Sequence, residues 1–556
     1  MKKPNHKHLF YGALLLSSLT FAQSNNQQQF RDGHKGPGLE MLDISSIGLV
    51  DSAAYANLIK QLDEKVKTHN QMIMDKFDIN KDGKLDSIEI DSINKWIEER
   101  KNFNPSMPQQ GDGGPNQEMP EGALNDNMGQ GEMPQKGNTG MMAKGGPGKH
   151  PMGGMNNANA SITPLANLEI SKQQITLSDK TLIANKKNES VIRTKKNGSL
   201  VATNLVINKV SGATSSGDES NFYALNAAVA AESGTSIILK GGTITSDAEG
   251  SNAVFAFGKN AKIEVSDLKI HTKQNSSRGL DATYGGTVIG NNLSINTEGA
   301  HCADLATDRG EGTILAKHVE GTTQGEGSPG IYSTGNITAE DCKFEAFGSE
   351  AAVIEGKNSI TVSNSKLIGH KSWGVMLYQS FSGDAGVGTS VFTMKNSELE
   401  AKEGPLFYST NTNTKVTLEN CVLTGYKGVL LRAEANKRWG RQGQNGAQVS
   451  FTATKQELKG SIEADNISTL DITFNENTNF NGAINYDNKA KSVKLTLKAG
   501  SKWNVTADSY ITDLTLDEGI ANIISNGHNI YYSSSQSKTL QNKTIKLNDG
   551  GYLKPM

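Results

Sequence analysis

Cysteine is scarce in this sequence, with three residues in a chain of 556, at Cys302, Cys342 and Cys421. So small and odd a number argues against a fold held together by disulfides. Cys342 and Cys421 also occupy equivalent places of a repeat described below, several coils apart, which is too far for a bond between their sulfurs. We therefore expect the cysteines to be buried core residues.

Apolar and aromatic residues are also few. Hydrophobic types make up 35% of the chain and aromatic types 6%, whereas glycine occurs 59 times. A compact globular domain of this length usually contains more apolar volume. A repetitive β-structure with a narrow core and many turns needs less, so the composition favours a mostly β architecture.

An excess of charge of either sign is lacking as well. The 56 Lys and Arg residues nearly balance the 58 Asp and Glu residues, for a net charge of -2. This balance creates no overall field that would attract nucleic acid or an anionic membrane, so we expect neither as a partner. Beyond the N-terminus no segment has 18 apolar residues in a row, so we expect no transmembrane segment in the mature chain.

The N-terminus has the three parts of a secretory signal peptide. Lys2, Lys3 and Lys7 precede an apolar run over residues 9–21, and the small residue Ala22 follows. A membrane anchor is the alternative, but the run is short for a bilayer span. The pattern predicts a signal peptide over residues 1–22 and an exported protein, whether secreted, on the cell surface or in the periplasm.

Three further regions differ in composition. Residues 23–101 include a polar segment with helical spacing, and residues 102–160 are rich in Gly, Pro, Met and Asn without apolar periodicity. The second of these is typical of a disordered linker. Residues 161–556 are rich in Thr, Ser, Val, Ile, Gly and Asn, in short runs that are typical of strands.

The last region repeats, and from Ile270 onward the intervals are 23 to 32 residues. One inward-facing column is expected to contain Ile207, Ile244, Ile270, Ile295, Gly321, Phe344, Leu367, Leu399 and Leu423. A second column lies three residues before most of these positions, at Asn204, Asp267, Asn292, His318, Asp341, Asn364, Asn396 and Asn420. Asn and Asp tolerate the left-handed conformation of a sharp corner, and when stacked they can form a side-chain ladder. Coils stacked in this way form a parallel β-helix, which we expect to be right-handed.

This region resembles the pectate-lyase-like right-handed parallel β-helices, a group that includes polysaccharide-active enzymes and bacterial adhesins. The segment 501–523 is similar to the C-terminal passenger segment of autotransporter adhesins, with the match carried by Trp503, Val505, Thr506, Ser509 and Leu514. The resemblance implies a β-helix that this segment closes. The expected fold class is mostly β, a right-handed parallel β-helix with a small α-helical module at the N-terminus.

Residues 78–89 fit a calcium-binding EF-hand loop at every required position. Calcium prefers six to eight oxygen ligands, and Gly83 permits the sharp turn that brings them together. Lys84 would supply its backbone carbonyl and Asp86 would act through water. The predicted ligands are Asp78, Asn80, Asp82, Lys84, Asp86 and Glu89.

Apolar residues on both sides of the loop support a helix before and after it, including Phe77 and Trp96. A dockerin repeat shares the first part of the loop but normally has a second loop, which the sequence lacks. An acidic surface turn is the simplest alternative. We expect calcium as the cofactor.

The densest ionisable cluster of the repeat region lies in residues 276–286 and 300–312, which should stack as neighbouring coils. We place Asp304 opposite Leu280 in this stack. Charges and aromatics on one face suit sugar binding, although they could also be loop charges that pair along the stack. The candidate ligand-binding face comprises Arg278, Asp281, Tyr284, Asp308, Arg309, Glu311, Tyr378 and Arg432.

These patterns support two functions of different classes. The first is an exported calcium-binding β-helix that is adhesin-like or binds carbohydrate, with a glycan or cell-surface ligand as partner and no catalytic residues. The alternative is a polysaccharide lyase or glycoside hydrolase acting on the same face. A structural protein of the cell envelope is a third possibility.

Overall fold

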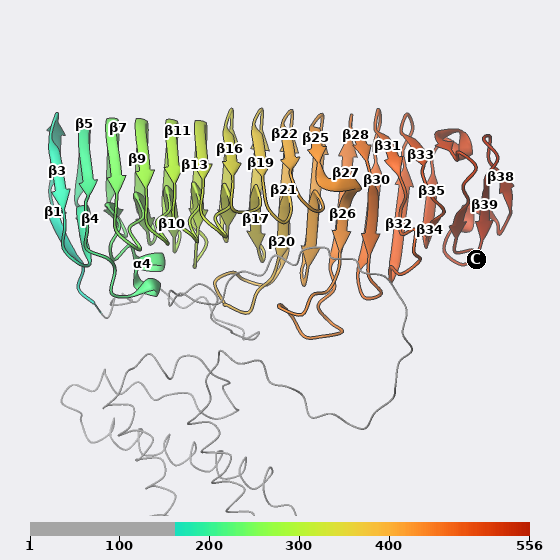
Figure 1. Ribbon diagram of the computed structural model, residues 1–556, viewed down its shortest axis with the longest axis horizontal. Helices are drawn as coiled ribbons and strands as arrows, with labels where there is room; N and C mark the ends of the chain where they lie inside the picture. Colours follow the sequence, from blue (N-terminus) through green and yellow to red (C-terminus); the bar gives the residue numbers. More distant parts are fainter. Residues whose placement is uncertain (1–161) are drawn as a thin grey trace, which may run out of the picture. The chain divides into compact units, whose positions relative to one another are not determined.

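The computed structural model describes residues 162–556, which form a right-handed parallel β-solenoid of about 16 turns (Figure 1). The prediction of a mostly β, parallel β-helical fold is confirmed. The predicted signal peptide (1–22), the helical module with its calcium loop (23–101) and the linker (102–160) lie outside the described residues. Within 162–556, no helix is long and apolar enough to cross a membrane.

One sheet contains twelve parallel strands, each a coil apart along the chain. We call it the first sheet. Its strands are β1 (Leu165–Ser171), β4 (Glu189–Lys195), β6 (Val229–Ala231), β8 (Val254–Phe257), β10 (Leu280–Thr283), β12 (Leu305–Thr307), β14 (Ile331–Ser333), β17 (Ala352–Glu355), β20 (Val375–Tyr378), β23 (Phe407–Thr410), β26 (Val429–Ala433) and β29 (Ser461–Ala464).

The remainder of each coil belongs to a bent second sheet, in which some strands run through the bend and others stop at it. Its strands are β2 (Gln174–Ser178), β3 (Thr181–Ala184), β5 (Ser199–Lys209), β7 (Ser236–Ser246), β9 (Lys262–Thr272), β11 (Thr287–Thr297), β13 (Thr313–Thr323), β15 (Asn336–Glu340), β16 (Lys343–Ala346), β18 (Ser359–Ser363), β19 (Lys366–Gly369), β21 (Thr389–Lys395), β22 (Glu398–Ala401), β24 (Asn413–Glu419), β25 (Val422–Gly425), β27 (Gln448–Thr454), β30 (Thr469–Phe474), β32 (Ser492–Leu497) and β35 (Asp513–Leu516).

Two four-stranded sheets complete the C-terminal coils. One contains β28 (Glu457–Lys459), β31 (Asn479–Gly482), β33 (Lys502–Val505) and β36 (Ile523–Ile524). The other contains β34 (Ser509–Ile511), β37 (Ile530–Tyr532), β39 (Tyr552–Pro555) and β38 (Ile545–Lys546), and its β38–β39 pair is antiparallel. Three short 3-10 helices are η1 (Tyr426–Gly428), η2 (Gly519–Asn522) and η3 (Lys538–Leu540).

The predicted inward column is confirmed coil by coil. Ile270 pairs with Ile295, Ile295 with Gly321, and Gly321 with Phe344, and the pairing continues in the same register to Leu423. The members of the column from Ile207 to Leu399 are buried. One contiguous narrow core therefore runs through the stack.

The predicted corners are also confirmed. All eight Asn, Asp and His residues of the corner column have positive φ, between 49° at Asn364 and 59° at Asp267. Some side chains at adjacent corners form hydrogen bonds with each other. Asn292 Nδ2 donates to Asp267 Oδ1 at 2.6 Å, and Asn420 Nδ2 donates to Asn396 Oδ1 at 2.9 Å. The bend of the second sheet therefore depends on residues that tolerate the left-handed region.

The three cysteines are buried and unbonded to one another, as predicted. Cys342 begins a polar row just inside the corner: its backbone N–H donates to Ser365 Oγ at 2.8 Å, and the Ser365 N–H donates to Ser397 Oγ at 3.0 Å. Burial raises the pKa of the Cys302 thiol to about 12 and that of Cys342 to about 11. Thiols with such pKa values are unreactive core groups.

A row of threonines on the outer face of the second sheet was not predicted. One threonine on each of eight consecutive strands, β15, β18, β21, β24, β27, β30, β32 and β35, pairs in register with the next. We call this the threonine row: Thr338, Thr361, Thr393, Thr417, Thr452, Thr473, Thr496 and Thr515. Each side chain is at least partly exposed.

Insertions between coils gather beside the first sheet. The helix α4 (Gly217–Tyr223) begins after Ser216, whose side chain caps the backbone N–H of Glu219 at 3.3 Å. Figure 1 shows α4 and the long loops that follow β20 and β26 on the same side of the stack. These insertions therefore border the sheet that carries the predicted ligand-binding face.

Candidate functional site

The predicted ligand-binding face is the outer surface of the first sheet. Asp281 lies on β10, Tyr378 on β20 and Arg432 on β26, at positions that alternate with core residues. Alternation along a strand directs such residues away from the core. The structure therefore brings residues from distant coils to one side, but it buries several of them.

Arg278 is the clearest example, since its side chain is only 1% exposed. Its Nη2 lies 3.0 Å from Asp308 Oδ2 and its Nη1 lies 3.5 Å from Asp281 Oδ2. Its Nη1 also donates to Asn221 Oδ1 on α4 at 3.0 Å. Burial raises the pKa of both carboxyls, although the guanidinium opposes the shift. Arg278 therefore connects α4 to two coils beneath the surface.

Arg309 connects two insertions. Its guanidinium lies 2.5 Å from Asp384 Oδ1, in the loop after β20, and 3.9 Å above the ring of Phe222 on α4. Nearby, Tyr284 stacks on Tyr223 with ring centroids 5.2 Å apart, and their hydroxyls are 3.0 Å apart. Burial raises the pKa of Tyr284. An arginine that bridges a carboxylate and an aromatic face is a rigid brace.

Tyr378 is 1% exposed and contacts a buried carboxylate, Glu355. Glu355 accepts hydrogen bonds from the Tyr378 and Tyr332 hydroxyls, both at 2.8 Å, and from the hydroxyls of Ser380 and Ser382. Burial raises the pKa of Glu355, while the hydroxyl donors pull it down. Because hydroxyls already surround this carboxylate, it is poorly placed to receive a ligand proton.

Aromatic side chains that were not predicted as part of this face cover the middle of the first sheet. Trp373 stacks on Tyr408 at 4.1 Å between centroids, and Trp439, in the loop after β26, lies 4.7 Å from the ring of Tyr378. Burial raises the pKa of Tyr408 to about 12. Trp373 lies two residues before β20, and its place next to this short apolar run was the signal available in the sequence.

The remaining predicted residues are less buried. Glu311 is exposed and its carboxylate lies 2.6 Å from Lys357 Nζ, while Arg432 Nη2 lies 2.9 Å from Glu463 Oε2. The expected placement of Asp304 is wrong by one position, because Leu280 pairs with Leu305. The strand β12 begins at Leu305, so Asp304 lies directly before the strand and not on it. Ligand binding at this face stays a prediction.

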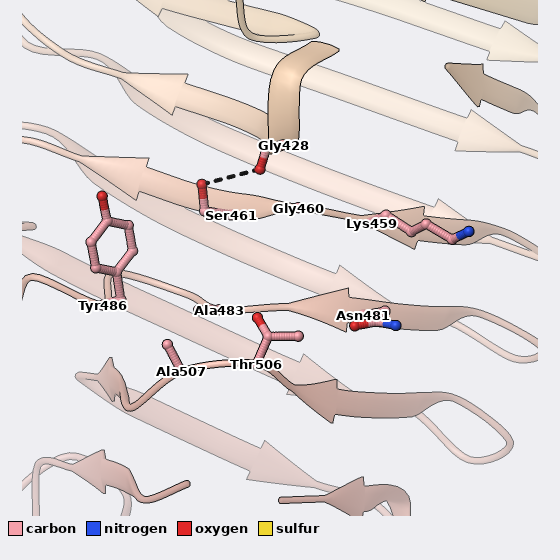
Figure 2. Close-up of a pocket in the computed structure, with 9 residues that line it drawn as sticks. All are labelled: Gly428, Lys459, Gly460, Ser461, Asn481, Ala483, Tyr486, Thr506 and Ala507. Carbon is pink, nitrogen blue, oxygen red and sulfur yellow. Dashed lines mark hydrogen bonds between the residues drawn. The ribbon is translucent and has the colours of Figure 1, made fainter. Parts of the chain in front are cut away.

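An open cavity of about 510 Å3 lies near the end of this face (Figure 2). It follows the corner where β28, β31 and β33 approach β26 and β29. Tyr486 stands at its edge with 47% of its surface exposed. The lining residues are Gly428, Lys459, Gly460, Ser461, Asn481, Ala483, Tyr486, Thr506 and Ala507.

Small residues at the corner create the cavity. Gly460 has a φ of +102°, and a Cβ there would stand 2.5 Å from the Gly428 carbonyl oxygen. Lys459 and Asn481 occupy paired positions of β28 and β31, so their polar groups lie side by side. The cavity thus combines an exposed ring with an amine and an amide. Such a set of groups can hold a small polar ligand.

One carboxylate links the cavity to the predicted face. Ser461, in the cavity lining, donates from its hydroxyl to Glu463 Oε1 at 2.6 Å, and Glu463 Oε2 pairs with Arg432. Arg432 is the last predicted residue of the face. The cavity is therefore a continuation of the surface that the sequence indicated.

A second cavity of about 440 Å3 follows the corner column. Its lining includes Asp341, Asn364, Asn396 and paired charges, such as Lys366 Nζ and Glu398 Oε2 at 2.7 Å. Within residues 162–556, no group of three or more His, Cys, Asp and Glu side chains is arranged to hold a metal ion. No protein-family model and no curated protein matches this chain.

Proposed function

We propose that this chain is an exported carbohydrate-binding β-solenoid, and that the cavity beside Tyr486 holds a short oligosaccharide. The observation that most directly supports this proposal is the exposed ring of Tyr486, which lies at the edge of a cavity lined by Lys459, Ser461, Asn481 and Thr506. A pyranose has an apolar face that stacks on an aromatic ring and hydroxyls that bond to amides and hydroxyls. The cavity volume is in the range of small-molecule sites.

Binding without turnover fits the lining better than catalysis does. The nine residues that line the cavity include neither a carboxylate nor a histidine. Glycoside hydrolysis usually requires a pair of carboxyl groups on either side of the bond. On the neighbouring face, Glu355 and Asp308 are engaged by hydroxyls and by Arg278. The similarity of 501–523 to passenger segments of adhesins also favours a binding role.

Calcium binding by residues 78–89 and export by residues 1–22 belong to the same proposal. Both rest on sequence motifs outside the described residues. In this proposal the calcium module and the carbohydrate site are separate parts of one secreted or surface protein.

Calorimetry of the full chain with soluble oligosaccharides, chosen from a glycan array, tests the proposal. We expect Tyr486→Ala and Asn481→Ala each to weaken binding about tenfold, because each removes a stacking surface or a hydrogen-bonding amide. Tyr552→Ala is the matched control, since Tyr552 is another exposed tyrosine, 37% exposed, that does not line the cavity. Unchanged affinity in both cavity variants, or release of shortened sugars by the wild type, would overturn the proposal.

A further inference from the structure

The threonine row carries an inference beyond the cavity. From Thr338 to Thr515, eight consecutive coils place a threonine at the same outward position. Adjacent strands lie about 4.8 Å apart, so the row presents hydroxyls and methyls at that interval over about 34 Å.

The hydroxyls of this row are free to bind. None of them makes a side-chain hydrogen bond to another described residue, whereas the serines inside the corner, such as Ser365 and Ser397, are hydrogen bonded. Each free hydroxyl can donate one hydrogen bond and accept two. The row is therefore an ordered array of donors and acceptors facing solvent.

Strand propensity alone does not explain the row. In the preceding coils the same column contains Thr176, Val201, Ile238, Glu264, Ile289 and Leu315, so this position accepts charged and apolar residues as well as threonine. Ile238 and Leu315 are 40% and 43% exposed, so exposure does not prevent apolar residues at this column. From Thr338 onward, each of eight coils has a hydroxyl at this position.

Charged residues of both signs flank the row and most are paired, although Lys415 and Asp513 have no ion pair among the described residues. Lys395 Nζ lies 3.0 Å from Glu419, Lys494 Nζ lies 3.8 Å from Asp471, and Lys498 Nζ lies 3.5 Å from Asp517. These pairs run along the stack on either side of the threonines. A surface with such paired charges offers no net field to a charged polymer, so it is complementary to an uncharged one.

We propose that the threonine row is a second binding site, for an uncharged, extended β-linked polysaccharide lying along the solenoid axis. The row and an unbranched extended polysaccharide are both linear, so several sugar residues can contact threonines at the same time. The hydroxyl bonds to a ring substituent and the methyl contacts the carbon skeleton. Many weak contacts in register add up to firm attachment to an insoluble polymer.

Sedimentation of the full chain with insoluble β-1,4-glucan and with chitin tests this site. The variant Thr393→Val, Thr417→Val, Thr452→Val and Thr473→Val keeps the side-chain shape but removes four hydroxyls. We expect it to lower the partition onto the polymer about tenfold or more, because each lost hydrogen bond weakens binding. Thermal unfolding of each variant verifies that the solenoid is intact.

Thr243→Val with Thr245→Val is the matched control, because both residues lie on β7 outside the row and are partly exposed. Tyr486→Ala separates the two sites: it should weaken oligosaccharide binding about tenfold while leaving sedimentation unchanged. Equal sedimentation of the four-valine variant and the wild type overturns the proposal, as does failure of the wild type to bind either neutral polymer. Stronger, salt-sensitive binding to polygalacturonate than to the neutral polymers overturns it too.

Discussion

The carboxyl group of Asp304 occupies the space that a side chain at Gly321 would fill. A Cβ on Gly321 would stand 2.4 Å from Asp304 Oδ2 and 2.5 Å from Phe344 Cδ1. Asp304 is fully buried, and neither of its carboxyl oxygens has a hydrogen-bond partner among the described residues. The glycine in the inward column is therefore matched to an acid on the opposite side of the same coil.

The close approach predicts that the two positions are coupled. Gly321→Ala should destabilise the protein by about 1 to 3 kcal/mol, because an added methyl forces its neighbours to shift. Asp304→Ala in the same chain removes one of the two clashes and should recover part of that loss. Urea unfolding of the two single variants and the double variant measures the coupling. Strictly additive effects would show that the two residues do not share this space.

Asp304 also predicts a pH dependence of stability. Burial raises its pKa well above the usual value, whereas in the unfolded chain the pKa is about 3.9. The folded state therefore holds the proton more tightly. This stabilisation is complete below about pH 3.9 and is lost as the pH rises from there through the raised pKa of the folded state.

Asp304→Asn removes the titration, so stability should fall less between about pH 4 and pH 8 than in the wild type. The difference is about 1.4 kcal/mol for each unit by which the pKa is raised. Unfolding midpoints across this range provide the measurement. Asp471→Asn is the control, since Asp471 is 53% exposed and its replacement should leave the profile nearly unchanged. Parallel profiles for the wild type and Asp304→Asn would contradict the prediction.

The corner column predicts a different response to glycine and alanine. Asn364 has a φ of 49°, a conformation that costs most non-glycine residues about 1 to 2 kcal/mol. Asn364→Ala should therefore lower the free energy of unfolding by about 1 kcal/mol, while Asn364→Gly should be nearly neutral. Chemical unfolding of both variants measures the difference. Equal losses would mean that the side chain of Asn364, and not its backbone conformation, stabilises the corner.

The register of the solenoid could be predicted because each coil repeats a local phrase. The pairing of Ile270 with Ile295 follows from similar residues at similar spacing, and a slip by one position would expose the core column. The bracing of the first sheet could not be predicted, because its partners come from insertions without a repeat. Arg309 and Asp384 are 75 residues apart, and nothing in the sequence of either loop specifies the other.

Arg309 is predicted to hold both insertions against the first sheet. Arg309→Ala removes the ion pair to Asp384 and the contact with Phe222, so hydrogen exchange should accelerate in α4 and in the loop 379–388. Arg309→Lys keeps the charge but loses the planar group, so it should restore only part of the protection. In Arg432→Ala, which breaks an ion pair elsewhere on this sheet, α4 should exchange as in the wild type. Unaltered exchange in Arg309→Ala would rule out the brace.

Calcium binding is predicted for the loop 78–89, with about one ion per chain. Glu89→Gln replaces the bidentate carboxylate of the closing ligand by a neutral amide, and Asp78→Ala removes the first ligand. Each variant should weaken calcium binding at least about tenfold in calorimetry. Asp112→Ala is a suitable control, because Asp112 lies in the predicted linker, outside the loop. Calcium removal should leave sedimentation with neutral polysaccharide unchanged, since the threonine row contains no metal ligands. Wild-type affinity in both loop variants would exclude this calcium site, and loss of sedimentation on chelation would show that calcium acts on the solenoid as well.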